Sequence, residues 1–200
     1  ENVLLLINSF DNAFLTEVLE KIKLSFFNYY GINLTIAISN SNSFDKIHRM
    51  YIETQECLQY AFYLGIGSIV SREDILLHES GNYSLDYDFN KIAMAVRTGN
   101  IESAIRELDN FFEKTRKDKM NTDLAKSYCS ELYHAIIRQC RPDELGNFMK
   151  KIIELQEMET LDQIYEFMKE VTVNISEYHY KCNSQKYSSV VKKMIDCVHF

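Results

Sequence analysis

The chain has 200 residues, of which 46% are hydrophobic and 26% are charged, and its formal net charge is −7. This length fits one domain or two small ones and excludes a large multidomain enzyme. The composition is close to that of average globular proteins, which excludes a wholly disordered chain. The balance of 29 acidic against 22 basic residues argues against a nucleic-acid-binding surface spread over the whole molecule. One proline and six glycines are too few for a sandwich or a barrel with many tight turns, so long helices are favoured.

The cysteines and the apolar segments indicate the compartment. Five cysteines are scattered along the chain without a C-x-x-C pair, at Cys57, Cys129, Cys140, Cys182 and Cys197. An odd number without close pairs is typical of a reducing compartment. The apolar run near the N-terminus is too short for a signal peptide, and no stretch approaches the roughly 20 apolar residues that span a bilayer. We therefore expect a soluble, cytoplasmic chain in which this segment makes no membrane contact.

The first part of the sequence alternates patterns of strand and helix. Short apolar runs and alternating apolar residues predict strands, whereas apolar residues at steps of three and four predict amphipathic helices. In chain order we expect a strand at 3–7, a helix at 14–27, a strand at 32–38, a helix at 44–62 and a strand at 66–70. Gly31 and Gly65 are the expected ends of the two helices. This order predicts a subdomain in which helices pack against a sheet.

From about residue 86 onward the strand signals stop. Apolar residues recur at helical spacing in the segments 89–96, 101–112, 124–136, 145–152 and 161–175, and a last helix is expected at about 185–200. Gly99 and Asn100 end the first of these helices, Pro142 fits the start of its helix, and Thr160 is a good N-cap. The predicted fold class is therefore α+β. An α/β subdomain at 1–82 is followed by an all-helical bundle at 83–184 and the start of a further helix at 185–200.

Familiar catalytic and phosphate-binding motifs are missing from the sequence, among them G-x-G-x-x-G, the Walker A loop, G-x-S-x-G and H-E-x-x-H. Cys129, His134 and Cys140 fall on one predicted helix, but their spacing places them on different faces, which disfavours a shared zinc ion. The acidic pair Glu53 and Glu56 is interpreted as a solvated helix face, since no nucleophile or base accompanies it. We predict that the chain is not an enzyme and has no catalytic, cofactor-binding or metal-binding residues.

The segment from residue 32 to residue 70 carries a recognisable pattern. A strand ends in Ser39, and the helix after it contains Y-I-E-T at 51–54 and C-L-Q-Y-A-F-Y-L-G at 57–65. This resembles the C-terminal half of a degenerate GGDEF-type domain, as found in the central region of YesN-type response regulators of the AraC family. The family pattern there is S-Y-x-E-A-x-x-A-L-x-Y-x-F-x-x-G, and Thr54 and Cys57 replace its alanines.

The helical part adds to the resemblance. G-N-I-E-S-A at 99–104, followed by Leu108, Phe111 and Phe112, is similar to the family's G-D-x-E-x-A…L…F-F helix hairpin. T-L-D-Q-I-Y-E-F-M at 160–168 is similar to its T-L-x-E-L-x-x-W-L element. Residues 190–200 look like the helix that opens the AraC-type DNA-binding domain. The resemblance thus covers nearly the whole chain in the right order.

This resemblance implies a non-catalytic regulatory and linker module of an AraC-family transcriptional regulator of the two-component type, which couples an upstream signal to DNA binding. Cyclase activity is not expected, because the glycine pair of a working cyclase is missing. DNA would be bound only through a helix-turn-helix domain beyond Phe200. The expected partners are a second copy of the chain or adjacent domains of the same polypeptide. The residues predicted to couple the domains are apolar positions of the terminal helix, namely Val191, Met194, Ile195 and Val198.

Two other functions stay open at this point. One is a small-molecule-sensing domain of a transcriptional regulator, with a pocket in the α/β part or at its junction with the helices. The other is a helical protein-interaction scaffold, because Gly99 and Asn100 followed by Ala104 also resemble the turn of a tetratricopeptide hairpin. The repeat of about 34 residues that defines such scaffolds is not evident elsewhere in the chain.

Overall fold

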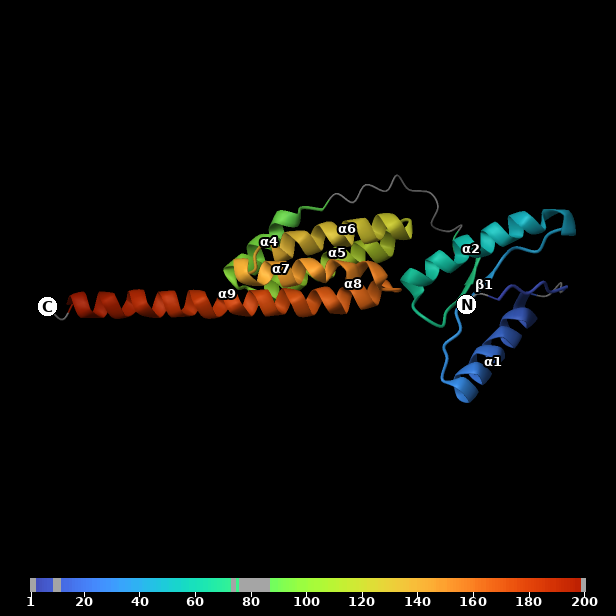
Figure 1. Cartoon of the computed structure of the whole chain (residues 1–200), viewed down its shortest axis with the longest axis horizontal. Helices are drawn as coiled ribbons and strands as arrows, with labels where there is room; N and C mark the ends of the chain where they lie inside the picture. The colour runs from blue at the N-terminus through green and yellow to red at the C-terminus, as the bar shows by residue number, and fades with distance from the viewer. Residues whose placement is uncertain (1–2, 9–11, 73–74, 76–86, 199–200) are drawn as a thin grey trace. The chain divides into compact units, whose positions relative to one another are not determined.

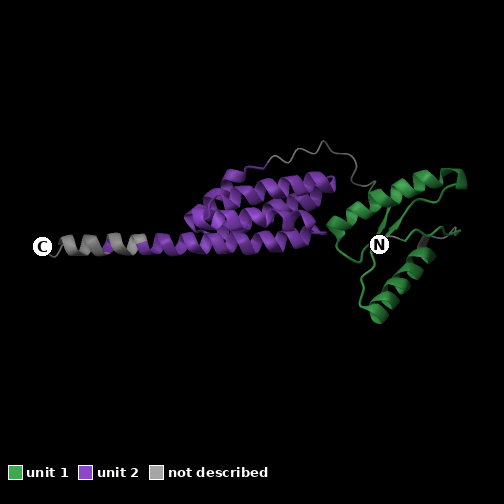
Figure 2. Ribbon diagram, viewed as in Figure 1, with its two compact units in different colours: residues 1–81 green, residues 82–200 purple. Residues whose placement is uncertain are grey.

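The structure is a computed structural model, which describes residues 3–8, 12–72, 75 and 87–198. Within its helices, the side chains of residues 12–13, 186–190 and 192–198 lie outside the described part. The chain divides into two compact units, Glu1–Gly81 (unit 1) and Asn82–Phe200 (unit 2) (Figure 2). Most described residues are helical, and a small parallel sheet lies in unit 1. The coarse α+β class predicted from the sequence is therefore confirmed.

Unit 1 is a strand–helix–strand crossover preceded by a helix. Its elements are α1 (Asn12–Tyr30), β1 (Ile36–Ile38), the 3-10 helix η1 (Phe44–Lys46), α2 (Ile47–Leu64) and β2 (Ile69–Ser71). The strands pair in parallel, with Ile36 opposite Ile69 and Ile38 opposite Ser71. Helix α2 joins the two strands and packs on both of them. The helix ends at Gly65, whose N–H donates to the Ala61 carbonyl oxygen at 2.8 Å.

The core of unit 1 is small because two three-residue strands offer little surface to cover. One cluster of it consists of the buried residues Cys57, Val70 and Ile75, against which Ala37 and Tyr60 pack. Cys57 comes from the face of α2 that meets the sheet, and Val70 is the central residue of β2. The apolar alternation of the two strands thus places one residue of β2 under the helix, as a parallel crossover requires.

The strand predicted at residues 3–7 is not formed. All five side chains there are exposed, from Ile7 at 49% to Val3 at 82%, and no secondary structure is assigned to them. The two other predicted strands are shorter than expected, because Ile32 and Ile66 are half exposed and the chain turns at Gly67. The Gly67 N–H donates to Thr35 Oγ1 at 3.1 Å and so fixes the turn just before β2. Apolar runs therefore overestimated the sheet, since each strand also needs a paired neighbour.

Unit 2 is all helical in its described part. Its helices are α4 (Phe89–Thr98), α5 (Ile101–Asp118), α6 (Thr122–Ile137), α7 (Pro142–Lys150), α8 (Ile152–Glu157) and α9 (Leu161–Val198). Side chains cap most of these helices: Asp88, Asn100 and Asn121 each accept a backbone N–H from the first turn that follows. Pro142 occupies the first turn of α7, as predicted. The helix predicted at 145–152 is two helices, with a break at Lys151 between α7 and α8.

Helices α4, α5, α6 and α9 enclose the core of unit 2. The largest fully buried side chains include Phe111, Phe112, Tyr133, Leu108, Ile92 and Ile136. Several are aromatic and meet edge to face, such as Phe111 and Phe112, whose ring centroids lie 5.3 Å apart. Core packing therefore explains much of the aromatic content of the sequence.

Helix α9 differs most from the sequence-based expectation. Two helices were predicted, at 161–175 and 185–200, but α9 is a single helix of 38 residues. The segment between them holds neither proline nor glycine, so nothing in the local sequence breaks the helix. Figure 1 shows that α9 lies along the other helices of unit 2 and then runs on beyond them. The segment predicted to start a separate helix is thus a continuation of a core helix.

Candidate functional site

The four predicted coupling residues all lie on the last part of α9. Val191, Met194, Ile195 and Val198 follow one another at steps of three, one and three residues, which place them on one face of the helix. Val191 is 53% exposed. The side chains of the other three lie outside the described part. The backbone therefore brings the four positions together on one face of α9.

The first part of α9 belongs to the core of unit 2. Leu161, Ile164, Met168 and Ile175 are at most 3% exposed, at the spacing of an amphipathic helix. The helix starts with a capping box: the Gln163 N–H donates to Thr160 Oγ1 at 3.2 Å, and the Thr160 N–H donates to Gln163 Oε1 at the same distance. This confirms Thr160 as the predicted N-cap. One end of α9 is therefore fixed in register within the bundle.

The turn between α4 and α5 holds α9 near the middle of its length. Gly99 has φ +73°, and a Cβ atom at this position would lie 2.4 Å from the backbone nitrogen of Tyr180. This turn and the helix are therefore in direct backbone contact, which only glycine permits. Next to it, the Asn183 side-chain nitrogen donates to the Thr98 carbonyl oxygen at 3.1 Å. The turn is fixed to α9 by close packing and by a hydrogen bond.

The loop between α6 and α7 holds the same part of α9. A ring nitrogen of His179, Nε2, lies 2.6 Å from the Gln139 carbonyl oxygen and donates to it, since a carbonyl only accepts. The Arg141 guanidinium lies over the Tyr178 ring, 5.1 Å from its centroid. Arg141 also pairs with Glu144 on α7. The α4–α5 turn and the α6–α7 loop, which are far apart in the sequence, thus both contact residues 178–183 of α9.

We call this set of contacts the anchorage. It consists of the contacts that Thr98, Gly99, Gln139 and Arg141 make with residues 178–183 of α9. Beyond it, Ser184, Gln185 and Val191 are all exposed. Up to the anchorage α9 is therefore in contact with two loops, whereas the described side chains after it are exposed. Sequence analysis recognised Gly99 as a helix end and the distal face as apolar. It missed His179 and Asn183, which carry no local signal because their partners lie in distant loops.

Cys129 is fully buried in α6, and its burial raises the pKa of the thiol to about 12. The protonated thiol is the less reactive form, so burial makes Cys129 a poor nucleophile at neutral pH. Among the described residues, no group of three or more His, Cys, Asp or Glu side chains could hold a metal ion. At the anchorage, a hydrogen bond with Cys182 raises the pKa of Tyr178.

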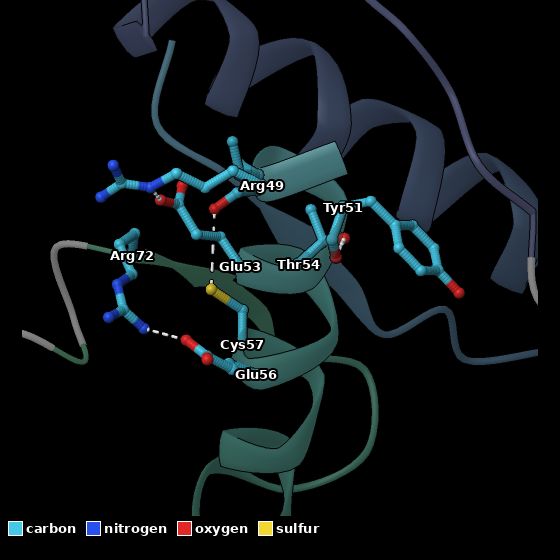
Figure 3. Close-up of polar contacts among 8 residues, drawn as sticks. Arg49, Tyr51, Glu53, Thr54, Glu56, Cys57 and Arg72 are labelled. Atoms are coloured by element: carbon cyan, nitrogen blue, oxygen red, sulfur yellow. Dashed lines mark hydrogen bonds and ion pairs between the residues drawn. The ribbon is translucent and has the colours of Figure 1, made fainter. Parts of the chain in front are cut away.

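Unit 1 carries a polar cluster where α2 meets the end of β2 (Figure 3). Arg49 Nε lies 3.2 Å from Glu53 Oε1, and Arg72 Nη1 lies 2.5 Å from Glu56 Oε2. The Cys57 thiol donates to the Ile38 carbonyl oxygen at 3.8 Å. The sequence-based interpretation of Glu53 and Glu56 as a solvated helix face is wrong for Glu53. This residue is only 8% exposed, and its Oε2 atom is buried without a hydrogen-bond partner in the described part.

The contacts of this cluster connect the helix to the sheet. Glu56 and Arg72 link α2 to the residue after β2, and Cys57 links α2 to the last residue of β1. We therefore assign the cluster a structural role in holding the crossover.

Comparison of the chain with models of protein families, with curated proteins and with solved structures gives no match. None of the helices in the described part is long and apolar enough to cross a membrane.

Proposed function

We propose that the chain is a non-catalytic regulatory and linker module of an AraC-family transcriptional regulator of the two-component type. In this proposal unit 1 is the degenerate GGDEF-like segment, and α9 transmits a signal to a DNA-binding domain that follows it. Support for unit 1 comes from its parallel strand–helix–strand crossover, in which the motif residues up to Gly65 form α2 and end it. Partners are adjacent domains or a second copy, and DNA is reached only through the following domain.

The observation that carries the proposal is the continuity of α9 through the anchorage. At 1.5 Å per residue, its 38 residues span about 57 Å. The segment after the anchorage, residues 184–198, is near the length at which an isolated helix is marginal in water, about 12 to 15 residues. It therefore needs either the continued register of α9 or an external partner for its apolar face. A change of either support would alter the distal segment, which provides the two states that a relay requires.

The alternatives are less well supported by the geometry. For a sensor with its pocket in the α/β part, the described cavities give no support, since the two best-formed ones both lie within unit 2. For a repeat scaffold, the turn of Gly99 and Asn100 remains the only supporting feature. Neither alternative explains why a core helix continues past its bundle.

The relay is tested in the polypeptide that joins this chain to paired helix-turn-helix domains, with operator binding measured in the signalled and unsignalled states. Gln185→Pro removes a helix hydrogen bond just beyond the anchorage and breaks α9 there. Gln185→Ala is its control. Ile195→Asp places a carboxylate on the apolar face, and Lys193→Asp places a carboxylate on the opposite face of the helix. We expect Gln185→Pro and Ile195→Asp to abolish the difference between the two states. A regulated response that survives both substitutions contradicts the relay.

A further inference from the structure

A groove runs between α7 and α9, next to the anchorage, and has a volume of about 520 Å³. This is within the range of small-molecule sites. One wall is formed at helical spacing by Glu144, Asn147 and Lys151, and the opposite wall by Asn174 and Tyr178 among others. The groove is lined by charged and carboxamide groups over an apolar floor that includes the buried Ile175. Neither the relay nor the sequence motifs use it.

The two helices run in opposite directions along the groove. Lys151, just after α7, lies 6.0 Å from the Phe167 ring centroid near the start of α9. Arg141, just before α7, stacks on Tyr178 further along α9. On α9, Asn174 lies between Phe167 and Tyr178 in the sequence. On α7, Asn147 lies between Arg141 and Lys151. The ammonium group of Lys151 therefore lies toward one end of the groove, and the carboxamides occupy its middle.

The charges of the groove are unevenly satisfied. Both of its carboxylates are already paired, Glu144 with Arg141 and Glu177 with Lys181 at 3.7 Å. Among the described residues, the ammonium group of Lys151 has no carboxylate within ion-pair distance. Arg141 Nε is buried without a hydrogen-bond partner there, although its guanidinium pairs with Glu144 and lies 3.8 Å from Asp143 Oδ1. Among the described residues, the groove thus offers one positive charge without a carboxylate partner, that of Lys151, and one unsatisfied donor, Arg141 Nε.

We propose that this groove binds a small organic anion, a carboxylate or phosphate ester with an apolar body. Lys151 and the carboxamides of Asn147 and Asn174 receive the anionic group, because charge-assisted hydrogen bonds are the strongest that these side chains form. The body of the ligand lies over Ile175 toward the ring of Tyr178. Such a ligand bridges α7 to α9 directly beside the anchorage. The binding itself does not depend on the proposed relay and can be tested separately.

The test measures the binding of phenylacetate, phenyl phosphate, inorganic phosphate and the neutral 2-phenylethanol to the whole chain by calorimetry. We expect saturable binding of at least one aromatic anion, weaker binding of inorganic phosphate and none of the alcohol. The two aromatic anions distinguish a carboxylate from a phosphate ester. The side-chain amide NMR signals of Asn147 and Asn174 should shift on titration.

Two variants locate the site. Lys151→Met keeps the aliphatic stem and removes the charge, and we expect it to weaken binding about tenfold, the usual effect of losing one charged hydrogen bond. Lys150→Met changes the neighbouring residue, which does not line the groove, and should leave the affinity unchanged. If Lys151→Met does not fold, as judged by circular dichroism, Asn174→Leu takes its place with the same expectation. Absence of saturable binding, equal binding of the neutral alcohol, or equal affinity in the groove variant would each overturn the proposal.

Discussion

The backbone at Gly99, in the turn between α4 and α5, lies against the backbone of α9 at Tyr180 with no side chain between them. A Cβ atom on Gly99 would lie 2.7 Å from the Cα atom of Tyr180 and 3.0 Å from the carbonyl carbon of His179. Backbone atoms cannot rotate away as the end of a side chain can, so the turn or α9 must shift to admit any other residue. The position of α9 at the anchorage thus depends on the absence of one methyl group.

Replacing Gly99 by alanine should destabilise unit 2. The left-handed conformation, φ +73°, costs a residue with a Cβ atom about 1 to 2 kcal/mol, and the contact with Tyr180 adds a backbone shift of similar cost. We expect the free energy of unfolding to fall by at least about 2 kcal/mol. Chemical denaturation followed by the helical circular dichroism signal measures it.

Gly146→Ala is the matched control. Gly146 lies inside α7, and a Cβ atom there would meet nothing within 4 Å. Because alanine is the better helix former, the control should stabilise the chain by up to about 1 kcal/mol. An alanine at position 99 that is as stable as the parent would show that the close contact with α9 is absent in solution.

What could be predicted from the sequence depended on how local the cause is. The cap at Thr160 and the proline at the start of α7 follow from residues within one turn, and both are confirmed. The strand at residues 3–7 is wrong, since a strand is completed by a neighbour that the local pattern does not contain. The anchorage was missed for the same reason: Gly99 marks a helix end in any fold, whereas its contact with Tyr180 depends on how the helices pack.

The single α9 shows the opposite error. The polar stretch between its two apolar parts resembles a linker, but it contains no residue that ends a helix. Asn183, a poor helix former, is retained within the helix because its side chain bonds the Thr98 carbonyl oxygen. Tertiary contacts thus carried the helix through a segment that sequence patterns divide.

The capping box at the start of α9 gives a second prediction. Thr160 Oγ1 accepts the Gln163 N–H, and Gln163 Oε1 in turn accepts the N–H groups of Thr160 and Glu159. Thr160→Ala should lower the free energy of unfolding by about 1 kcal/mol, the usual cost of losing an N-cap. Thr160→Ser keeps the hydroxyl and should retain most of the stability. If serine were as damaging as alanine, the loss would come from the methyl group and the cap would be unimportant.

A third prediction concerns alkaline pH. The Tyr165 hydroxyl on α9 donates to Asp109 Oδ1 on α5 at 2.7 Å, and this bond raises the pKa of Tyr165 above its ordinary value of 10.0. A tyrosine whose pKa is raised in the folded state stabilises the fold at every pH below its ordinary pKa. This stabilisation is lost as the pH rises above the ordinary pKa and through the raised one. The stability difference between the parent and Tyr165→Phe should thus be constant up to about pH 10 and shrink above it.

Denaturation at a series of pH values from neutral to alkaline measures this difference. Burial also raises the pKa values of Tyr87 and Tyr133, so the parent itself should lose stability in the alkaline range. A difference for Tyr165→Phe that stays flat throughout contradicts the bond to Asp109.

The last prediction uses the cysteines as reporters of packing. Cys57 and Cys129 are fully buried, whereas Cys182 on α9 is exposed. Burial raises the pKa of Cys129 to about 12, so at mildly alkaline pH this thiol lacks both access and the reactive thiolate form. Iodoacetamide should therefore modify Cys182 rapidly and Cys57 and Cys129 only in denaturant, with each site followed by peptide mass spectrometry. Equal rates at Cys129 and Cys182 in the native chain would mean that α6 is not packed in the core. The Gly99→Ala variant extends the test, because loosening α9 from the α4–α5 turn should speed the labelling of Cys129 in the core beneath and leave Cys57 in unit 1 unchanged.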